Sequence, residues 1–149
     1  MSSLESVVRE SLARASSHTK NVFGKNPLTA NEIIELANTK GTMSLAATVR
    51  PIGQPHLTPT TAIGMDGKLY VGFDGGTAQL KNLKDNPRLT LMLMESRVRQ
   101  AIIEGYVSFL EKSDPLVKRV GDLQVKKYGW NTESIAELVP EKVFTFKSA

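Results

Sequence analysis

The segment 73–83 holds the residues whose types and spacing best suit a binding site, and it reads Phe-Asp-Gly-Gly-Thr-Ala-Gln-Leu-Lys-Asn-Leu. Gly75 and Gly76 lead into a predicted helix that begins after Thr77. Free backbone N–H groups and the helix dipole favour an anion at such a helix start. The pattern therefore predicts a phosphate held by Thr77 and the neighbouring backbone, with Lys81 nearby. The alternative is a plain glycine turn followed by a threonine N-cap.

Other side chains offer weaker candidates. His56 beside a turn could act as an acid or base, but no serine–histidine–acid arrangement is legible, so no catalytic residue is named. Arg97 and Arg99 flank a predicted hairpin turn and could hold a phosphate or a carboxylate, although solvated charge is the favoured interpretation. Two histidines among scattered carboxylates do not predict a metal site. The lack of cysteine excludes disulfides, thiolate metal sites and cysteine nucleophiles.

Composition narrows the class of protein. A chain of 149 residues with 40% hydrophobic and 23% charged residues is typical of one globular domain. The longest apolar run, 89–94, is too short to cross a bilayer, and 1–17 lacks an apolar signal region, so we expect a cytoplasmic protein without membrane contact. The net charge of +4 is spread along the chain and aromatics are 6%, which disfavours a nucleic-acid platform.

The N-terminal part predicts helices. Apolar residues at helical spacing indicate a helix over 3–16, followed by a linker over 17–27. Thr29 and Glu32 form a capping box for the next helix, which we expect to end at Gly41. The chain is therefore predicted to be a single domain over 1–149, with an N-terminal helical extension over 1–28.

The remainder predicts strands with few helices. Pro59 requires an edge or a bulge, Gly105 marks a bend, and Ser113 caps a helix that Gly129 ends. Residues 89–94 are expected to be buried on both faces, and 130–139 to be irregular or partly helical. The predicted strands lie at residues 42–49, 56–63, 69–73, 89–94, 101–110 and 142–147, with a short helix at 78–84. Sequential, mostly antiparallel strands predict an α+β fold, a small barrel with flanking helices.

Several groups of residues, in order, resemble the pyridoxamine 5'-phosphate oxidase-like FMN-binding split-barrel family. In 48–60 an arginine, a glycine and a proline frame a hairpin turn. Gly76-Thr77 and the stretch 82–88, Asn-Leu-Lys-Asp-Asn-Pro-Arg, are similar to the family's helix and its asparagine-proline-arginine signature. Arg99-Gln100 followed by Glu104-Gly105 is similar to its arginine-glutamine strand. The matches cover about half of the chain.

The resemblance implies a split barrel that forms a homodimer, with FMN in two clefts between the subunits and oxidoreductase activity on a small substrate. A deazaflavin-dependent reductase and a dimeric binding module that has lost tight flavin binding are the alternatives. Thr58 and Thr60 would lie under the flavin and its phosphate tail, Thr77 at the phosphate, and Gln100 against the polar edge of the ring. The implied cofactor-binding residues are Thr58, Pro59, Thr60, Phe73, Gly76, Thr77, Gln79, Lys81, Asn82 and Gln100.

One departure concerns charge. The family usually places a lysine, often after an arginine, where this chain has Ala78 and Gln79. A charge-assisted hydrogen bond is roughly twice as strong as a neutral one, so Arg50, Lys81 or a partner-subunit residue would have to replace it. The tail 143–149 carries only one lysine, which disfavours pyridoxamine-phosphate oxidation itself.

Overall fold

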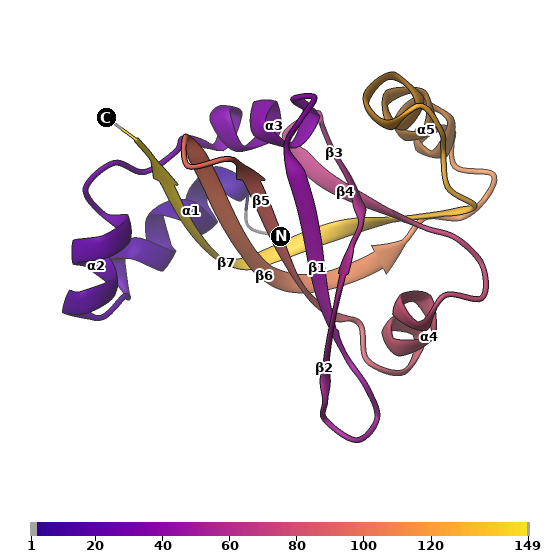
Figure 1. Ribbon diagram of the computed structural model, residues 1–149, viewed down its shortest axis with the longest axis horizontal. Coiled ribbons are helices and arrows are strands. Elements are labelled where there is room, and N and C mark those ends of the chain that lie inside the picture. The colour runs from indigo at the N-terminus through magenta and orange to yellow at the C-terminus, as the bar shows by residue number, and fades with distance from the viewer. Residues whose placement is uncertain (1–2, 149) are drawn as a thin grey trace.

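A computed structural model describes residues 3–148, which form one curled antiparallel sheet of seven strands with five flanking helices (Figure 1). The strand order is β2-β1-β5-β6-β7-β4-β3. The predicted α+β split barrel is confirmed. The strands are β1 (Met43–Val49), β2 (Pro55–Pro59), β3 (Thr61–Met65), β4 (Lys68–Phe73), β5 (Arg88–Glu95), β6 (Arg99–Phe109) and β7 (Ser134–Lys147). The helices are α1 (Leu4–Ala13), α2 (Ser17–Phe23), α3 (Ala30–Asn38), α4 (Ala78–Asp85) and α5 (Pro115–Tyr128).

The two outer strands of the sheet, β2 and β3, are consecutive in the chain. The prediction of one strand over 56–63 is therefore wrong: β2 pairs with β1, and after Thr60 the chain pairs with β4 as β3. At the crossing the Thr60 backbone N–H donates to the Ser44 carbonyl oxygen at 2.9 Å. Pro59 lies in the edge strand β2, as predicted, where its missing N–H is tolerated.

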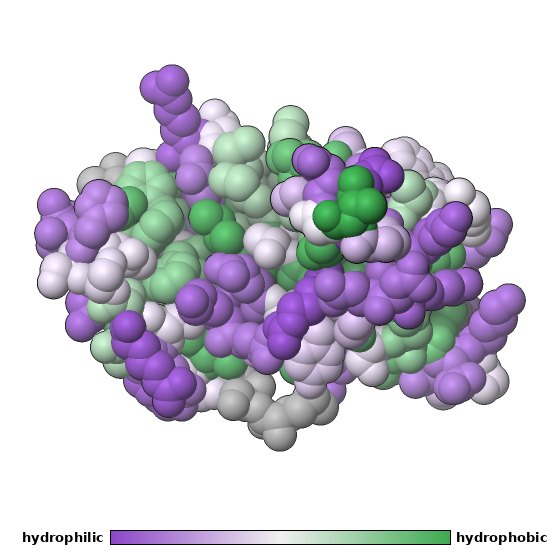
Figure 2. Space-filling view, turned by 90° about the horizontal axis from the view of Figure 1, so that it is seen from below, coloured by the Kyte–Doolittle hydropathy of each residue, from purple (hydrophilic) through white to green (hydrophobic). Residues whose placement is uncertain are grey.

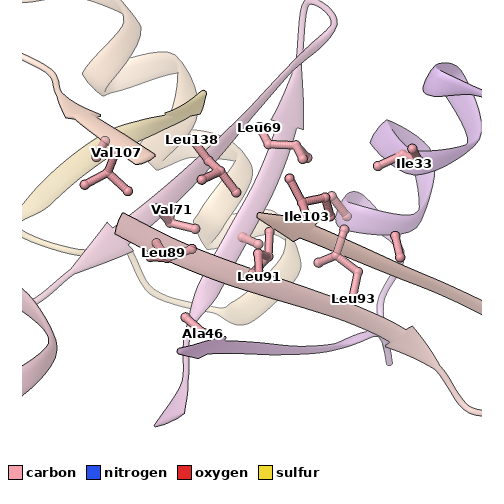
Figure 3. Close-up of a cluster of buried hydrophobic side chains, with 14 of the residues drawn as sticks. Ile33, Ala46, Leu69, Val71, Leu89, Leu91, Leu93, Ile103, Val107 and Leu138 are labelled. Atoms are coloured by element: carbon pink, nitrogen blue, oxygen red, sulfur yellow. The ribbon is translucent and has the colours of Figure 1, made fainter. Parts of the chain in front are cut away.

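The inward face of the sheet forms the main core (Figure 3). Leu89, Leu91 and Leu93 of β5 are at most 2% exposed and meet side chains from β4, β6 and β7. Alternate β5 residues such as Thr90 and Met92 are only half-buried, so the prediction that 89–94 is buried on both faces is wrong. Alternation is what a strand with one covered face requires.

The N-terminal segment packs on the barrel. The predicted linker over 17–27 is wrong in part, because the Ser16 hydroxyl accepts the Thr19 N–H and caps α2. The capping box of α3 is confirmed, although α3 ends at Asn38 rather than at Gly41. Hydrogen bonding from the Thr29 N–H and from Lys147 holds the pKa of Glu32 below its ordinary value.

The C-terminal segment differs most from expectation. Residues 130–139 are not irregular or helical throughout, because β7 runs unbroken from Ser134 to Lys147. Pro140 is accommodated at a register shift between Glu104 and Gly105. A Cβ on Gly105 would lie 2.0 Å from the Val139 carbonyl oxygen, so this bend requires glycine.

The cap of α5 is Asp114, not the predicted Ser113, because the Asp114 carboxylate accepts the Leu116 N–H at 2.9 Å. Pro115 occupies the first turn of α5, as expected, where its missing N–H costs nothing. Gly129, with φ at 90°, ends the helix as predicted. In residues 3–148 no helix is long and apolar enough to cross a membrane.

The C-terminal end of α5 fastens the free edge of β3. The Tyr128 hydroxyl accepts the Ala62 N–H at 2.9 Å and donates to the Ala62 carbonyl oxygen at 3.1 Å. The neighbouring Lys127 ammonium donates to the carbonyl oxygens of Ala37 and Ala62, which ties in the end of α3 as well. Backbone groups that β4 does not pair are thereby satisfied.

We expect Tyr128→Phe to lower the free energy of unfolding by about 1–3 kcal/mol, the cost of a buried donor left unpaired. The reason is that Ala62 is fully buried and its N–H would lose its partner. Urea unfolding followed by circular dichroism measures the change. Tyr106→Phe is the matched control, since Tyr106 is half-buried on the outer face of the sheet. Equal stability of the two variants would contradict this role for Tyr128.

Candidate functional site

A strip of polar side chains runs along the inward face of β1 and β2. His56 pairs in register with Thr48, and Thr58 pairs with Ala46. Opposed residues of paired strands share a face, so the half-buried side chains of His56, Thr58 and Thr60 lie on the covered side of the sheet. Pro59 alternates to the outer, exposed side.

Four buried side-chain atoms in the described part of the chain have no hydrogen-bond partner: Thr42 Oγ1, His56 Nδ1, Thr60 Oγ1 and Gln79 Nε2. Thr42 precedes β1 and is an even-numbered residue, like the inward-facing residues of that strand. Thr42, His56 and Thr60 therefore belong to the polar strip. The fourth lies on α4, which packs against β1. Buried polar groups are nearly always paired, so this concentration fits a polar ligand at the strip.

The buried side of α4 faces the strip. Gln79 and Asn82 are 7% and 5% exposed and lie one helical turn apart. The Asn82 Nδ2 donates to the Thr48 hydroxyl at 3.1 Å, which joins α4 to β1. Phe73, at 2% exposure, packs on Phe109 with ring centroids 5.9 Å apart. The structure thus brings Gln79 and Asn82 to the strip, whereas Phe73 belongs to the core.

Thr77 serves as the N-cap of α4. Its hydroxyl accepts the Leu80 N–H at 3.3 Å and donates to the Asp74 carbonyl oxygen at 3.0 Å. Gly76, with φ at 78°, forms the turn before it. The plain alternative from the sequence therefore accounts for the Thr77 hydroxyl, while a phosphate at its backbone stays a prediction.

Carboxylates, not cations, surround this turn. The Glu133 Oε2 accepts the Gly75 N–H at 3.2 Å, and the Glu133 N–H donates to the Asp74 Oδ1 at 3.4 Å. Nothing in the sequence pointed to Glu133, because it is 58 residues from Gly75 in the chain. The local charge disfavours a second anion at the first turn of α4.

Positive charge lies instead one turn further along α4. A cavity of about 430 Å³ separates α4 from the β1–β2 turn and is lined by Arg50, Pro51, Ile52, Ala78, Lys81, Asn82 and Asp85. Lys81 is exposed and Arg50 half-buried. Asn82 belongs both to this cavity and to the polar strip.

In a single subunit, Gln100 lies far in space from α4. Gln100 pairs with Met94 of β5, and Met94 pairs with Met43 at the start of β1. Asn82 of α4 contacts Thr48, near the other end of β1. Five residues of strand separate these points, roughly 16 Å. One chain therefore does not bring Gln100 to the other predicted residues.

The arginine next to Gln100 has a structural role. Arg99 pairs with Glu95 at 3.0 Å and with Glu35 at 3.4 Å. Hydrogen bonding to Glu95 raises the pKa of Arg99, and the same bond lowers the pKa of Glu95. In residues 3–148 no cluster of histidine and carboxylate side chains is placed to hold a metal ion.

The curled sheet whose two outer strands meet at Thr60, with a polar strip beneath α4, defines a split β-barrel protein. The chain belongs to the pyridoxamine 5'-phosphate oxidase family, whose model matches residues 30–148. The comparison with curated proteins finds no match.

Solved structures share the fold. The conserved hypothetical protein Rv2991 from Mycobacterium tuberculosis matches with a TM-score of 0.68 and 22% identity, over 80% of this chain and 85% of that one. HutZ, described as the heme storage protein from Vibrio cholerae, matches with a TM-score of 0.62 and 20% identity, over 78% of this chain and 92% of that one. An FAD-binding protein from Mesorhizobium loti matches with a TM-score of 0.60 and 16% identity, over 82% of this chain and 96% of that one. At these identities the likeness shows the fold alone.

We expect Gln79→Met to raise the free energy of unfolding of the ligand-free protein by about 1 kcal/mol, since an unpaired buried amide is removed at similar volume. Thermal and urea unfolding measure the change. Gln54→Met is the control, because Gln54 is exposed, and it should leave stability unchanged. Destabilisation by Gln79→Met would mean that the amide has a partner within the folded chain.

Proposed function

We propose that this protein is an FMN-binding flavoprotein, an oxidoreductase acting on a small substrate. One observation carries the proposal: the unpaired buried atoms of His56 and Thr60 lie on the polar strip, and that of Gln79 lies on α4, which packs against β1. Membership of the family and a structural neighbour described as FAD-binding support a flavin as the ligand. A polar, planar ligand would give these atoms the partners that the chain does not.

The residues of the strip would hold and orient the flavin. Thr58, Pro59 and Thr60 form the strand under it, and the amide of Gln79 hydrogen-bonds to it from α4. The hydrogen bond from Asn82 to the Thr48 hydroxyl holds α4 against β1. When bound, a flavin supplies the hydride and electron chemistry itself. The chain's contribution is to bind, to orient and to exclude water, and we assign no catalytic acid or base.

A homodimer that pairs through the outer face of the sheet is the assembly we propose. On the outer face of the sheet, apolar residues lie directly opposite one another across five strands: Pro59, Leu45, Met92, Ile102 and Phe144. Leu57 and Met43 on the same side are 65% and 53% exposed. Leu45, Met92 and Ile102 are half-buried, and Phe144 packs on Phe23 of α2, so the exposed apolar part of this face lies toward its edge at β1 and β2. Exposed apolar residues gathered in one place are typical of an interaction surface. Gln100 has the same parity as Ile102, so pairing of two such faces would bring Gln100 into the interface between the subunits.

A second candidate, a dimeric binding module without tight flavin binding, is favoured by the carboxylates at the turn before α4. Glu133 accepts the Gly75 N–H at a position that would otherwise be open to a phosphate. A deazaflavin in the same strip is the third candidate.

We expect the purified protein to bind FMN with quenching of flavin fluorescence and absorbance bands near ~370 and ~450 nm, a property of the cofactor. Gln79→Met should weaken binding about tenfold, the loss of one hydrogen bond of roughly 1.4 kcal/mol, while Gln54→Met should not. A colourless protein that takes up no FMN in titration would rule out the proposal, and uptake of deazaflavin or heme alone would name a different ligand.

We also expect a dimer in solution that Leu57→Glu and Met43→Glu together convert to a monomer, because they place charges on the apolar outer face. Light scattering after size-exclusion chromatography gives the mass. Ser113→Glu adds a charge on an exposed loop and should leave the dimer intact. A monomeric wild-type protein would contradict the proposed assembly.

A further inference from the structure

We propose that a cavity between α1 and the edge of the sheet at β4 and β7 is a second binding site, which takes a small apolar amine with its ammonium group on Glu137. The cavity has a volume of about 420 Å³. Its lining shares no residue with the polar strip or with α4. The inference therefore goes beyond the proposed function and holds whether or not a flavin binds.

The cavity forms where β7 changes neighbours. β4 pairs with β7 only as far as Leu69 opposite Leu138. Further along β7 its place is taken by α1, whose Ser11 hydroxyl accepts the Val143 N–H at 2.9 Å. A helix with its side chains is roughly 10 Å across, about twice the spacing of paired strands. A helix cannot continue the line of a strand without leaving a gap, and the cavity is that gap.

The inner part of the cavity is apolar. Leu4, Leu69 and Leu138 line it and belong to the main core, and the last two are labelled in Figure 3. Val139 and Pro140 extend the apolar lining along β7. On the face drawn in Figure 2, by contrast, apolar side chains lie in small groups between polar ones. Small-molecule pockets have volumes of about 300–1,000 Å³ and are mostly apolar with a few polar groups, so this cavity suits an apolar ligand body.

Glu137 provides the polar group for the head of the ligand. Its side chain is only 16% exposed, although it carries a charge. Within the part of the chain that the structure describes, the Glu137 carboxylate accepts one hydrogen bond, from the Lys68 ammonium at 3.4 Å. Charge-assisted hydrogen bonds are normally about 2.7–2.9 Å long, and a carboxylate has two oxygens to satisfy. The Glu137 carboxylate is thus able to accept a second, shorter bond from a ligand ammonium.

The charges around the cavity favour a cation. Among the described residues of the lining, two carboxylates, Asp66 and Glu137, stand against the ammonium of Lys68. Arg119 of α5 pairs with Asp66 at 3.1 Å, but it does not line the cavity. Burial raises the pKa of the neighbouring Tyr70, and the negative charges of nearby carboxylates, Glu137 first among them, raise that pKa further. A positive head group therefore has the more favourable Coulomb energy here.

An anionic head group would have to use the start of α1, and that position is already supplied. The Ser3 hydroxyl accepts the Ser6 N–H at 3.2 Å. Glu5 in the first turn provides the negative charge that a helix N-terminus favours. An anion would also lie beside Glu137. A small apolar carboxylate is therefore the control ligand in the test.

The wall that α1 contributes lies outside the family match, which begins at residue 30. Ser3 and Leu4 stand at the start of α1. The site combines this N-terminal segment with the β3–β4 turn at Gly67 and with the middle of β7. Membership of the family therefore does not account for the cavity.

The test titrates phenethylamine, an ammonium at neutral pH, into the isotope-labelled full chain and follows backbone amides by NMR. Two probes of nearly the same shape, neutral phenethyl alcohol and anionic hydrocinnamate, are the comparison. The amide shifts of Leu4, Gly67 and Leu69 should change with the amine and give its Kd. We expect the amine to bind at least about tenfold more tightly than either comparison probe, because only the amine makes a charge-assisted bond to a carboxylate.

Two substitutions should act in opposite directions. Glu137→Gln keeps the shape of the side chain and removes its charge, so it should weaken phenethylamine about tenfold and leave phenethyl alcohol within about twofold. Lys68→Gln removes the competing ammonium and should tighten phenethylamine several-fold, a gain that loss of folding cannot produce. Glu141→Gln is the matched control and should change neither affinity: it removes a carboxylate of the same strand that pairs with Arg88 and does not line the cavity.

The inference is overturned if the amine shifts no amide at the cavity, if hydrocinnamate binds more tightly, or if Glu141→Gln weakens the amine as much as Glu137→Gln does. Displacement of the amine by FMN also overturns it, because the cavity lies apart from the polar strip. If the chain binds no flavin, the proposed function fails while the result with the amine stands, so the two failures are distinguishable.

Discussion

The closure of the sheet at Thr60 is the constraint on which the remaining structure depends. Because β2 and β3 are consecutive in the chain, the sheet has to curl until its two outer strands meet end to end at Thr60. The hydrogen bond from the Thr60 N–H to the Ser44 carbonyl oxygen marks the point where pairing passes from one side to the other. Tyr128 then satisfies the side of β3 that no strand covers. The barrel, its core and its open side all follow from this crossing.

The candidate site is a consequence of the same crossing. An edge strand has one neighbour only, so the inward side chains of β2 are half-buried, while those of β1 are fully covered. The loop after β4 returns α4 to this half-open place, where Asn82 fixes it to Thr48. Polar side chains with unpaired atoms thus collect where the sheet is least complete. A ligand there would fill a position that the fold itself creates.

Much of the fold was predictable from local chemistry. The capping box at Thr29, the edge position of Pro59 and the bend at Gly105 each express a rule that operates over a few residues. The division of 56–63 was not predictable, because either half alone reads as strand and only the pairing partners differ. The strand over 134–147 was missed because Pro140 reads as a break until its bulge partner in β6 is known.

The candidate site was predictable in part. The resemblance to the family grouped Thr58, Thr60, Gln79 and Asn82. In the structure the two threonines lie at β2 and the other two on the buried side of α4, which packs against β1. Glu133 at the turn before α4 was beyond reach, because a contact across 58 residues leaves no local signal. The position of Gln100 likewise depends on strand register, and the sequence holds no direct record of register.

The prolines of β2 carry a consequence for how the molecule avoids aggregation. The outermost strand of an open sheet presents unused hydrogen-bonding groups that can recruit a strand from another molecule and start a growing fibre. Pro55 and Pro59 lie at both ends of β2 and have no N–H to offer, so an invading strand would find an interrupted ladder. Leu57 between them can stay exposed without that hazard. The chain is thereby free to associate through side chains while its backbone stays closed to polymerisation.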